Sequence, residues 1–537
     1  MVGLKHPSLW GTVCVVLCGL SAGAALAQGP AQKQGGGAVQ TGASYQNDTS
    51  LPLYYLPAWS GKKAAGREAA ENPRIPNHHV DSEDTVIQRR LFAPTLRMPA
   101  PIATFDGINV AAGCGACAPP DTDGAVGETQ YVQMVNTAYQ IFDKATGASL
   151  AGPTQISALW AGFGGVCETG GAGDPIVLYD KLAKRWVISQ FAGGTVITDE
   201  CIAVSITSDA TGSYHRYGFH LGSNFFDYPH LGVWPDGYYM AMNVFNAAGT
   251  AYLGPQPFAF DRAAMLAGNP ATFVSTGIIS ANDAPILPAD FDGQTLPALG
   301  APAPFVEFPG NAPPTYQVFR FHADFVTPAN TTFTLAGSPA AAGYTALCAS
   351  SRACVPQLGV ANTDWLDGIG DRLMFRLAYR NFGGHEALVS NYSVSANNVA
   401  GVRWFELRNA TTGAPTVFQE GTYQPDTTWR WMGSAAMDAM GDIAVGFSAS
   451  SAGINPQIRY AGRLATDPPG VLTQGEAHLF DGTFSQTGNG NRWGDYSDLT
   501  VDPIDDCTFW YTNEYVDAAG WNTRIGSFKF PGCAAAK

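Results

Sequence analysis

The sequence predicts an all-β protein, and three features of its composition favour that class. Of 537 residues, 62 are Gly and 36 are Pro, and both types form turns and interrupt helices. Aromatic residues make up 12% and charged residues only 14%, which suits many short strands rather than long, charged helices. Hydrophobic residues make up 46%, so the chain can bury a core and is not disordered as a whole.

The charge balance narrows the classes of partner. Lys and Arg number 29 and Asp and Glu number 44, which gives a net charge of −15. Nucleic acid is disfavoured because phosphate neutralisation needs clustered cations, and an anionic membrane surface is disfavoured for the same reason. Neutral glycans, cationic ligands and metal ions remain compatible with this charge.

Residues 1–27 are predicted to be a secretion signal. Lys5 precedes an apolar run from Leu9 to Leu20, and the small residues of Ala25-Leu26-Ala27 suit cleavage after Ala27. A membrane anchor is the alternative, but the apolar run is several residues too short to cross a bilayer. Since no other stretch is long and apolar enough to span a membrane, we expect a secreted or periplasmic protein.

Eight cysteines remain after the expected cleavage, and an even number in an exported chain predicts disulfides. Pairing by proximity favours four bridges, although the sequence alone does not fix the connectivity. They are Cys114–Cys117, Cys167–Cys201, Cys348–Cys354 and Cys507–Cys533. A redox pair or half of a zinc site is the alternative for Cys114-Gly-Ala-Cys117, but no second ligand pair has matching spacing.

Residues 28–100 are predicted to form a flexible N-terminal extension. The segment QKQGGGAVQTG (32–42) is of low complexity, and the residues that follow are polar with scattered Pro. Such a composition is typical of a flexible linker.

From about residue 119 one pattern recurs along the chain. Each unit starts with a polar step rich in acidic or aromatic residues, continues with an apolar strand and a turn, and ends with an aromatic-rich strand. The units begin in the segments 119–136, 173–191, 226–245, 289–308, 370–394, 428–450 and 492–515. Turns that place Asp or Asn near Thr-Gly recur in 142–150, 208–217 and 408–418, and Gly there suits hairpins.

Seven such units predict a single seven-bladed β-propeller over residues 101–533. No blade can bury both of its faces alone, so the ring is expected to fold as one domain. Residues 102–107 are expected to supply the outer strand of the last blade and so close the ring. Two stacked β-sandwiches are the alternative, which the regular repetition disfavours.

In such a ring, the strand starts and the ends of the second strands meet at one face, where we expect a funnel. Carboxylates, amides and aromatics at those positions favour a ligand site there. Turn capping is the alternative for any single Asp. The candidate catalytic residues are Asp121, Asp123, Asp174, Asp227, Tyr228, Asp495, Tyr496 and Glu514. The candidate substrate-binding residues are Asn136, Asn243, Arg430, Trp431, Arg492 and Trp493.

A bound Ca²⁺ is a further hypothesis for the same funnel. Asp290 and Asp292 precede Gly293 in an Asp-x-Asp-Gly pattern, which offers hard oxygen ligands beside a turn glycine. The pattern lacks the full spacing of a helix–loop–helix calcium site. Asp290 and Asp292 are therefore the candidate metal ligands.

Several segments resemble a group of exported bacterial propeller proteins. They are PPDTDGAVG, DPIVLYDKLAKRWVISQF, YRNFGGHEALV, NPQIRYAGR and RWGDYSDLTVDPIDDCTFWYTNEY, and the resemblance covers residues 100 to 533. It implies a propeller fold and export, but no activity. More distantly, TSDATGSYHRY (207–217) is similar to the Asp-box hairpin of sialidase-like proteins, with Tyr in place of the usual Trp.

A funnel rich in carboxylates and aromatics suits glycan chemistry. Two carboxyl groups with different pKa values can serve as acid and base, and Tyr and Trp faces stack on sugar rings. The sequence thus predicts a monomeric, exported protein that cleaves a polysaccharide or oligosaccharide in its funnel. Two alternatives stay open: a glycan-binding or adhesion propeller without catalysis, and a metal-assisted polysaccharide lyase.

Overall fold

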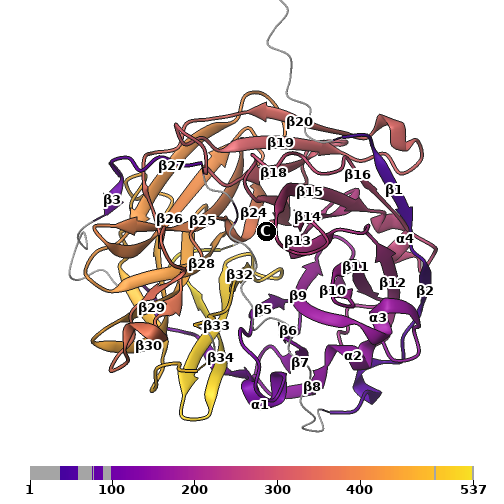
Figure 1. The fold of residues 1–537 in the computed structure, drawn as a ribbon, viewed down its shortest axis with the longest axis horizontal. Helices are drawn as coiled ribbons and strands as arrows, with labels where there is room; N and C mark the ends of the chain where they lie inside the picture. Colours follow the sequence, from indigo (N-terminus) through magenta and orange to yellow (C-terminus); the bar gives the residue numbers. More distant parts are fainter. Residues whose placement is uncertain (1–36, 59–74, 76–77, 89–97, 489–490, 535–537) are drawn as a thin grey trace, which may run out of the picture.

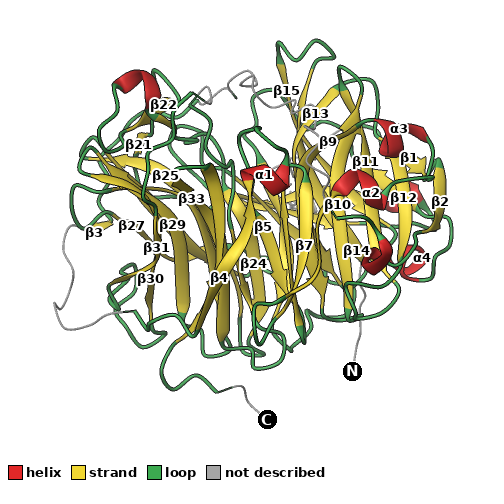
Figure 2. Cartoon of the chain, turned by 90° about the horizontal axis from the view of Figure 1, so that it is seen from below, coloured by secondary structure: helices red, strands yellow, loops and turns green. Residues whose placement is uncertain are grey.

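The computed structural model describes residues 37–58, 75, 78–88, 98–488 and 491–534. The described chain is all-β, as predicted, and its helices are single turns at the periphery (Figures 1 and 2). They are α1 (Val110–Gly113), α2 (Ile156–Leu159), α3 (Gly165–Thr169) and α4 (Arg262–Leu266), with 3-10 turns η1 (Leu53–Tyr55), η2 (Pro328–Asn330) and η3 (Asn362–Asp364). None of the described helices is long and apolar enough to cross a membrane. The expected signal, 1–27, lies outside the described residues.

Most strands belong to sets of consecutive antiparallel strands that lie side by side around one centre (Figure 1). The first set contains β5 (Asp123–Val126), β6 (Gln130–Val135), β7 (Ala138–Asp143) and β8 (Ser149–Gln155). The second contains β9 (Gly171–Asp180), β10 (Arg185–Gly193), β11 (Ile197–Ser205) and β12 (Tyr214–His220). The third contains β13 (Phe225–Trp234), β14 (Gly237–Phe245), β15 (Tyr252–Phe260) and β16 (Thr272–Ser275).

The second half of the chain continues the arrangement. The fourth set contains β17 (Ile286–Asp292), β18 (Ala303–Glu307), β19 (Gln317–His322) and β20 (Thr332–Gly337). The fifth contains β24 (Met374–Asn381), β25 (Glu386–Ala396), β26 (Val399–Arg408) and β27 (Thr416–Tyr423). The sixth contains β28 (Trp429–Met437), β29 (Ile443–Ser451), β30 (Ile454–Arg463) and β31 (Glu476–Asp481). The last contains β32 (Asp498–Val501), β33 (Thr508–Asp517) and β34 (Gly520–Lys529).

Three short strands lie between the fourth and fifth sets. β21 (Thr345–Ala346) pairs with β25, and β22 (Ala353–Val355) pairs with β23 (Leu366–Asp367). The first strands of these two sets, β17 and β24, pair in parallel. The fourth and fifth sets therefore form one continuous sheet.

The first strands of the sets form a closed circle. In order, β5, β9, β13, β17, β24, β28 and β32 each contact the next, and β32 contacts β5. We call the side where these strands begin the entry face, and the side where they end the exit face. This circle places residues from distant parts of the sequence next to one another.

A strand from the front of the chain completes the last set. β4 (Ala103–Asn109) pairs antiparallel with β34, with Ala103 opposite Ser527 and Ile525 opposite Phe105. This pairing agrees with the expectation that residues 102–107 supply the outer strand there. The two ends of the ring are thus joined by backbone hydrogen bonds.

Three short segments of the extension pair with strands of the ring, whereas the sequence predicts a flexible segment. β1 (Gln40–Ala43) pairs with β16, β2 (Gln46–Thr49) pairs with β12, and β3 (Ile87–Gln88) pairs with β27. These strands lie along the outer edges of three sets (Figure 1). An edge strand needs only backbone hydrogen bonds on one side, so its polar sequence carries no strand signal.

The core lies between neighbouring sets. Because both faces of an inner sheet are covered, strands such as β14 are buried at every position, and they read as continuous apolar runs. Large side chains fill the contacts between sets, among them the fully buried Trp160, Trp186, Trp234 and Trp404.

All four expected disulfides are present. Cys114–Cys117, Cys167–Cys201, Cys348–Cys354 and Cys507–Cys533 are each bonded. The last of them joins the turn before β33 to the residues that follow β34. It therefore fixes the C-terminal end of the chain to the last set.

Candidate functional site

The entry face carries a recurring backbone feature. Asp121, Asp174, Tyr228 and Met432 have φ values of 44°, 43°, 56° and 48°, a left-handed conformation that side chains other than Gly rarely adopt. Asp174, Tyr228 and Met432 coincide with shifts in the register between the first and second strands of their sets. Such conformations cluster at functional sites, where surrounding contacts hold them.

Asp121 is held between Asn136 and Asp495. Asn136 Nδ2 donates to Asp121 Oδ2 at 2.7 Å, and the backbone N–H of Asp495 donates to Asp121 Oδ1 at 2.6 Å. Asp121 immediately precedes the first set, whereas Asp495 precedes the last one. This hydrogen bond therefore joins the two ends of the ring at the entry face.

Glu514, on β33, is the second carboxyl group of this cluster. The backbone N–H of Gly494 donates to Glu514 Oε2 at 2.8 Å, and Oε1 has no hydrogen-bond partner in the described part of the chain. Burial, together with the charges of Asp121 and Asp495, raises the pKa of Glu514 well above its usual range. Burial and the two neighbouring carboxylates therefore both favour the protonated form of the Glu514 carboxyl group.

Asp495 connects the cluster to a chain of ion pairs. Arg492 Nη2 donates to Asp495 Oδ1 at 2.6 Å, and Arg492 Nε lies 3.5 Å from Asp367 Oδ2. Arg352 Nε in turn donates to Asp367 Oδ1 at 3.0 Å. Burial raises the pKa of Asp367 to about 6, against the opposing effect of Arg352. The Asp495 side chain is 15% exposed, so part of this chain of groups is open to solvent.

Tyr228 lies beside a second Arg–carboxylate pair. The Arg372 guanidinium lies 4.6 Å from the centre of the Tyr228 ring, and Arg372 Nε donates to Asp371 Oδ1 at 2.8 Å. Burial raises the pKa of Tyr228 well above its usual range, while Arg372 opposes this effect. The negative charges of Asp495, Asp371 and Asp121 also raise the pKa of the Tyr228 hydroxyl. These groups therefore lie in one region.

A cavity of about 510 Å³ adjoins this region. Arg352 and Asp371 line it, together with Asp81 of the N-terminal segment and the apolar Leu347 and Ile369. Arg352 belongs to both the cavity wall and the chain of ion pairs. A ligand in the cavity would therefore meet both apolar surface and charged groups, as ligand pockets commonly offer.

Six of the predicted site residues thus share one region of the entry face. They are Asp121, Asn136, Tyr228, Arg492, Asp495 and Glu514. Four residues that sequence reasoning missed lie with them: Arg352, Asp367, Asp371 and Arg372. Asp367 belongs to the short strand β23, and the other three stand in loops. None of the four lies in a strand of a set, so the repeated pattern did not single them out.

Three predicted substrate-binding residues serve the fold instead. Trp431 and Trp493 are fully buried and pack on one another at 5.8 Å between ring centres, so neither indole can stack on a sugar in this structure. The Arg430 guanidinium is bound by Asp426 and Glu476. Aromatic residues at strand starts suit core packing as well as ligand stacking, and here packing prevails.

The remaining amide and acidic candidates on the entry face connect adjacent strands. The Asp174 N–H donates to Asn136 Oδ1 at 2.9 Å, which links the second set to the first. Asp227 lies opposite Asn243 in the β13–β14 ladder. Both carboxylates are more than nine-tenths buried.

Tyr496 points deeper into the interior. Its hydroxyl donates to the carbonyl oxygen of Pro175 at 3.2 Å, and its ring lies 5.3 Å from the ring of His230. Burial lowers the pKa of His230 to about 3, so the imidazole is neutral. Neither ring nitrogen of His230 has a hydrogen-bond partner in the described chain.

Asp123 does not lie at the entry face but inside the ring of first strands. Its carboxylate accepts from the N–H groups of Gly124 and Val177 at 2.6 and 3.0 Å. Asp498, which the sequence analysis did not select, shares this buried environment. Burial raises the pKa of Asp123 to about 7, and burial together with the charge of Asp123 raises that of Asp498 well above its usual range.

The calcium hypothesis for Asp290 and Asp292 needs correction. Arg376 Nη2 lies 2.8 Å from Asp290 Oδ2 and 2.7 Å from Asp292 Oδ1. The guanidinium already neutralises both carboxylates, so they do not present a cation site. Spacing in the sequence could not reveal this, because Arg376 comes from the next set.

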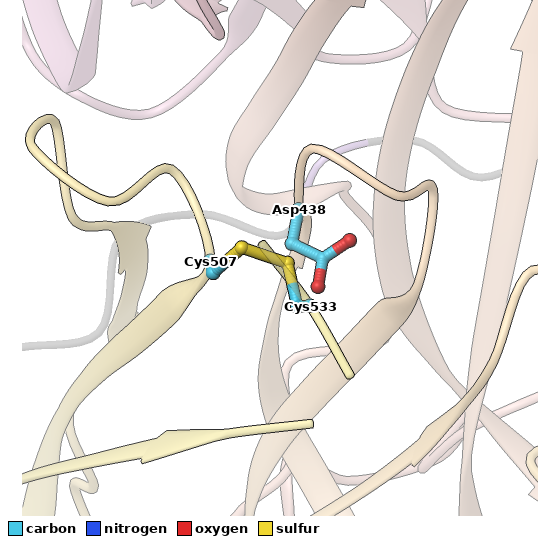
Figure 3. A group of neighbouring side chains, drawn as sticks. All are labelled: Asp438, Cys507 and Cys533. Carbon is cyan, nitrogen blue, oxygen red and sulfur yellow. A yellow bond between two sulfur atoms is a disulfide. The ribbon is translucent and has the colours of Figure 1, made fainter. Parts of the chain in front are cut away.

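One cluster of potential metal ligands occurs in the described chain. Asp438, Cys507 and Cys533 bring one ligand atom each within 4.8 Å of one another (Figure 3). The two sulfur atoms are joined in a disulfide, and a disulfide offers no thiolate to a metal. The cluster is therefore not a metal centre in the oxidised protein.

No protein-family model and no curated protein matches the chain. A Dyadobacter fermentans protein of unknown function resembles 68% of this chain over 96% of its own length, with 10% identity and a TM-score of 0.37. An endo-arabinase from Bacteroides thetaiotaomicron resembles 67% over 95% of its length, with 10% identity and a TM-score of 0.29. A mutant sialidase of Trypanosoma rangeli resembles 66% over 53%, with 10% identity and a TM-score of 0.31. At these TM-scores the likeness carries no argument about function.

Proposed function

We propose that the protein is an exported, seven-bladed propeller that cleaves a polysaccharide or oligosaccharide at the entry face. The closed circle of first strands supports the seven blades, and four disulfides fit an oxidising compartment outside the cytoplasm. The observation that carries the proposed activity is the meeting of Glu514 with Asp121 and Asp495, since burial raises the pKa of one carboxyl group beside two others.

Each group has a distinct role in this proposal. Glu514 acts as the acid that protonates the leaving oxygen of a glycosidic bond, because its raised pKa keeps a proton available. Asp495, paired with Arg492, is the carboxylate that acts as base or nucleophile. Arg352 and Asp371 bind the glycan in the adjoining cavity.

A non-catalytic glycan-binding protein is the second candidate, and one observation favours it. The Glu514 side chain is 0% exposed, so a bound glycan reaches the acid only if neighbouring residues move. A binding protein needs no such movement. The metal-assisted lyase has less support, because Arg376 neutralises the expected metal ligands Asp290 and Asp292.

The test is an incubation of the purified protein with a panel of neutral and acidic polysaccharides, followed by assays for new reducing ends and for unsaturated products. Hydrolysis predicts reducing ends without unsaturation, and each of Asp495→Asn and Glu514→Gln should lower the rate at least ~100-fold. Asp517→Asn, the same type of change at the end of strand β33, is the matched control and should leave the rate unchanged. Saturable binding without products would favour the second candidate, and unsaturated products would favour a lyase.

A further inference from the structure

The exit face contains a cavity that the proposed function does not use. It measures about 400 Å³ and is lined by residues that follow four of the first strands, including Glu128, Lys181, Gln294 and Ile504. The strands β5, β9, β17 and β32 all end at this face. The cavity therefore lies at the end of the ring that is opposite to Glu514. It therefore forms a site separate from the entry face.

Lys181 differs from the other lysines of the described chain. Lys144, Lys184 and Lys529 each have a carboxylate oxygen at 2.9, 2.6 and 3.2 Å from Nζ. For Lys181, the carboxylate oxygen within reach is Asp292 Oδ1, at 3.8 Å, which is longer than a hydrogen bond. The Lys181 side chain is only 12% exposed, and its Nζ lies 5.2 Å from the centre of the Phe291 ring.

The Asp292 carboxylate is not available to Lys181 alone. Arg376 Nη2 lies 2.7 Å from the same oxygen, Asp292 Oδ1. Arg380 lies on β24 of the fifth set and is paired with Asp506. Its positive charge also lowers the pKa of the Lys181 amine. The Lys181 amine is therefore enclosed beside two guanidinium groups that have already bound the neighbouring carboxylates.

These surroundings lower the pKa of the Lys181 amine. Burial lowers the pKa of Lys181 to about 8; Asp292 and Asp506 oppose the shift, while Arg380 and Arg376 reinforce it. Glu128 and Lys184 also face the cavity and form an ion pair with one another at 2.6 Å. The neutral form of an amine is the one that attacks carbonyl groups, and a lowered pKa makes more of this form available near neutral pH.

The rest of the cavity wall is largely apolar around Lys181. It includes Tyr179, Leu182, Pro503 and Ile504. The Tyr179 hydroxyl oxygen is itself buried and has no hydrogen-bond partner in the described part of the chain. A small carbonyl compound in the cavity would therefore meet apolar surface beside the Lys181 amine.

We infer that Lys181 is a nucleophilic amine that forms imines with small aldehydes bound in the exit-face cavity. The Nζ lone pair attacks the carbonyl carbon, and one proton passes from the nitrogen to the carbonyl oxygen, which gives a carbinolamine. The hydroxyl group then leaves as water with the second proton of the nitrogen, and the C=N bond forms. The reaction consumes one amine and one aldehyde and releases one water, so no oxidant or reductant is required.

The test uses glycolaldehyde as the probe, with cyanoborohydride to trap the imine as a stable secondary amine. The intact, folded protein is labelled at a series of pH values and digested, and each lysine is quantified by mass spectrometry. At neutral pH Lys181 should react at least ~10-fold faster than Lys184 or Lys529, since a pKa of about 8 leaves far more neutral amine than the usual value. Its rate should rise with a midpoint near pH 8.

Two controls separate the site from general lysine reactivity. Unfolding the protein in guanidinium before labelling should abolish the preference for Lys181. In the folded protein, Lys181→Met should remove most of the early label, whereas Lys529→Met, a change outside the cavity lining, should leave it in place. Equal labelling of Lys181 and Lys184 in the folded wild-type protein, or a midpoint near that of an exposed lysine, would overturn the inference. Because labelling is read without any glycan, its outcome is independent of the proposed activity.

Discussion

Arg376 donates from Nε to Asp290 Oδ2 at 2.9 Å, although the two residues lie 86 positions apart in the sequence. The same guanidinium reaches Asp292 and the carbonyl oxygen of Leu499. Arg376 therefore connects three of the first strands, β17, β24 and β32, inside the ring. Its side chain is 1% exposed, so this connection is shielded from water.

Replacement of Arg376 by Met should strongly destabilise the protein. It leaves two buried carboxylates without their cation, and loss of one partner of a buried ion pair typically costs about 3–5 kcal/mol. The free energy of unfolding, measured by chemical denaturation, checks this. Arg524→Met is the matched control, because its partner Asp106 has a largely exposed side chain, and it should have a much smaller effect. An Arg376→Met variant as stable as Arg524→Met would contradict the assigned role.

Replacement of Asp498 by Asn should weaken the pH dependence of stability. Burial raises the folded-state pKa of Asp498, so the folded protein retains a proton that the unfolded chain releases above about pH 4. This group therefore contributes less stability as the pH rises from about 4 toward its folded-state pKa. Asn stays neutral throughout, so the variant should lose less stability over that range.

Thermal unfolding at a series of pH values checks this prediction. The melting temperature of the wild-type protein should fall more steeply between about pH 5 and pH 8 than that of Asp498→Asn. Asp517→Asn, which removes a partly exposed carboxylate, should follow the wild-type curve. Parallel curves for the wild-type protein and Asp498→Asn would show that Asp498 ionises normally.

Loss of the Cys507–Cys533 bridge should destabilise the protein more than loss of Cys114–Cys117. The first bridge spans 26 residues and the second spans 3, and the chain-entropy model gives about 3 kcal/mol for the longer loop and about half of that for the shorter one. Paired Cys→Ser variants compared by denaturant unfolding measure the difference. The Cys507/Cys533 variant should also show faster proteolysis after β34, and equal stabilities for the two variants would contradict the loop-length argument.

Deletion of residues 37–58 should expose the outer edges of two sets. It removes β1 and β2, which pair with β16 and β12, and it removes Asp48, whose carboxylate binds Arg216 through two hydrogen bonds. Hydrogen exchange should become faster at 272–275 and 214–220, and the melting temperature should fall. Amides of the β33–β34 ladder serve as the internal control and should keep their protection. Unchanged exchange at 214–220 would show that β2 adds no protection.

Much of the architecture is visible in the sequence because repeated patterns report on backbone geometry. The apolar runs predict the strands, the strand starts predict the meeting of Asp121 with Asp495, and residues 102–107 supply the closing strand as expected. The edge strands of the extension are not visible, since Gln40–Ala43 pairs along β16 without an alternation of apolar and polar side chains. An unpatterned polar segment has the same composition whether it pairs or not.

The chemistry of the site is harder to predict for a different reason. Trp493 and Arg492 are neighbours in the sequence, but one is sealed in the core and the other binds Asp495 at the entry face. Which carboxylate an arginine meets depends on the packing of adjacent sets, as Arg376 shows for Asp290 and Asp292. Sequence spacing identifies candidate groups, whereas their partners and protonation follow from contacts between distant segments.

The pairing of β4 with β34 makes closure of the ring depend on the synthesis of β34. Thr523 Oγ1 donates to the carbonyl oxygen of Ile108 across 415 positions of the sequence, so the earliest strand of the ring is made long before its partner. A growing chain emerges N-terminus first and carries this unpaired edge until β34 has left the ribosome. Closure over such a separation is slow compared with local pairing. The native ring therefore closes only after β34 has been made, and a chain that ends before β34 has no strand with which to close it.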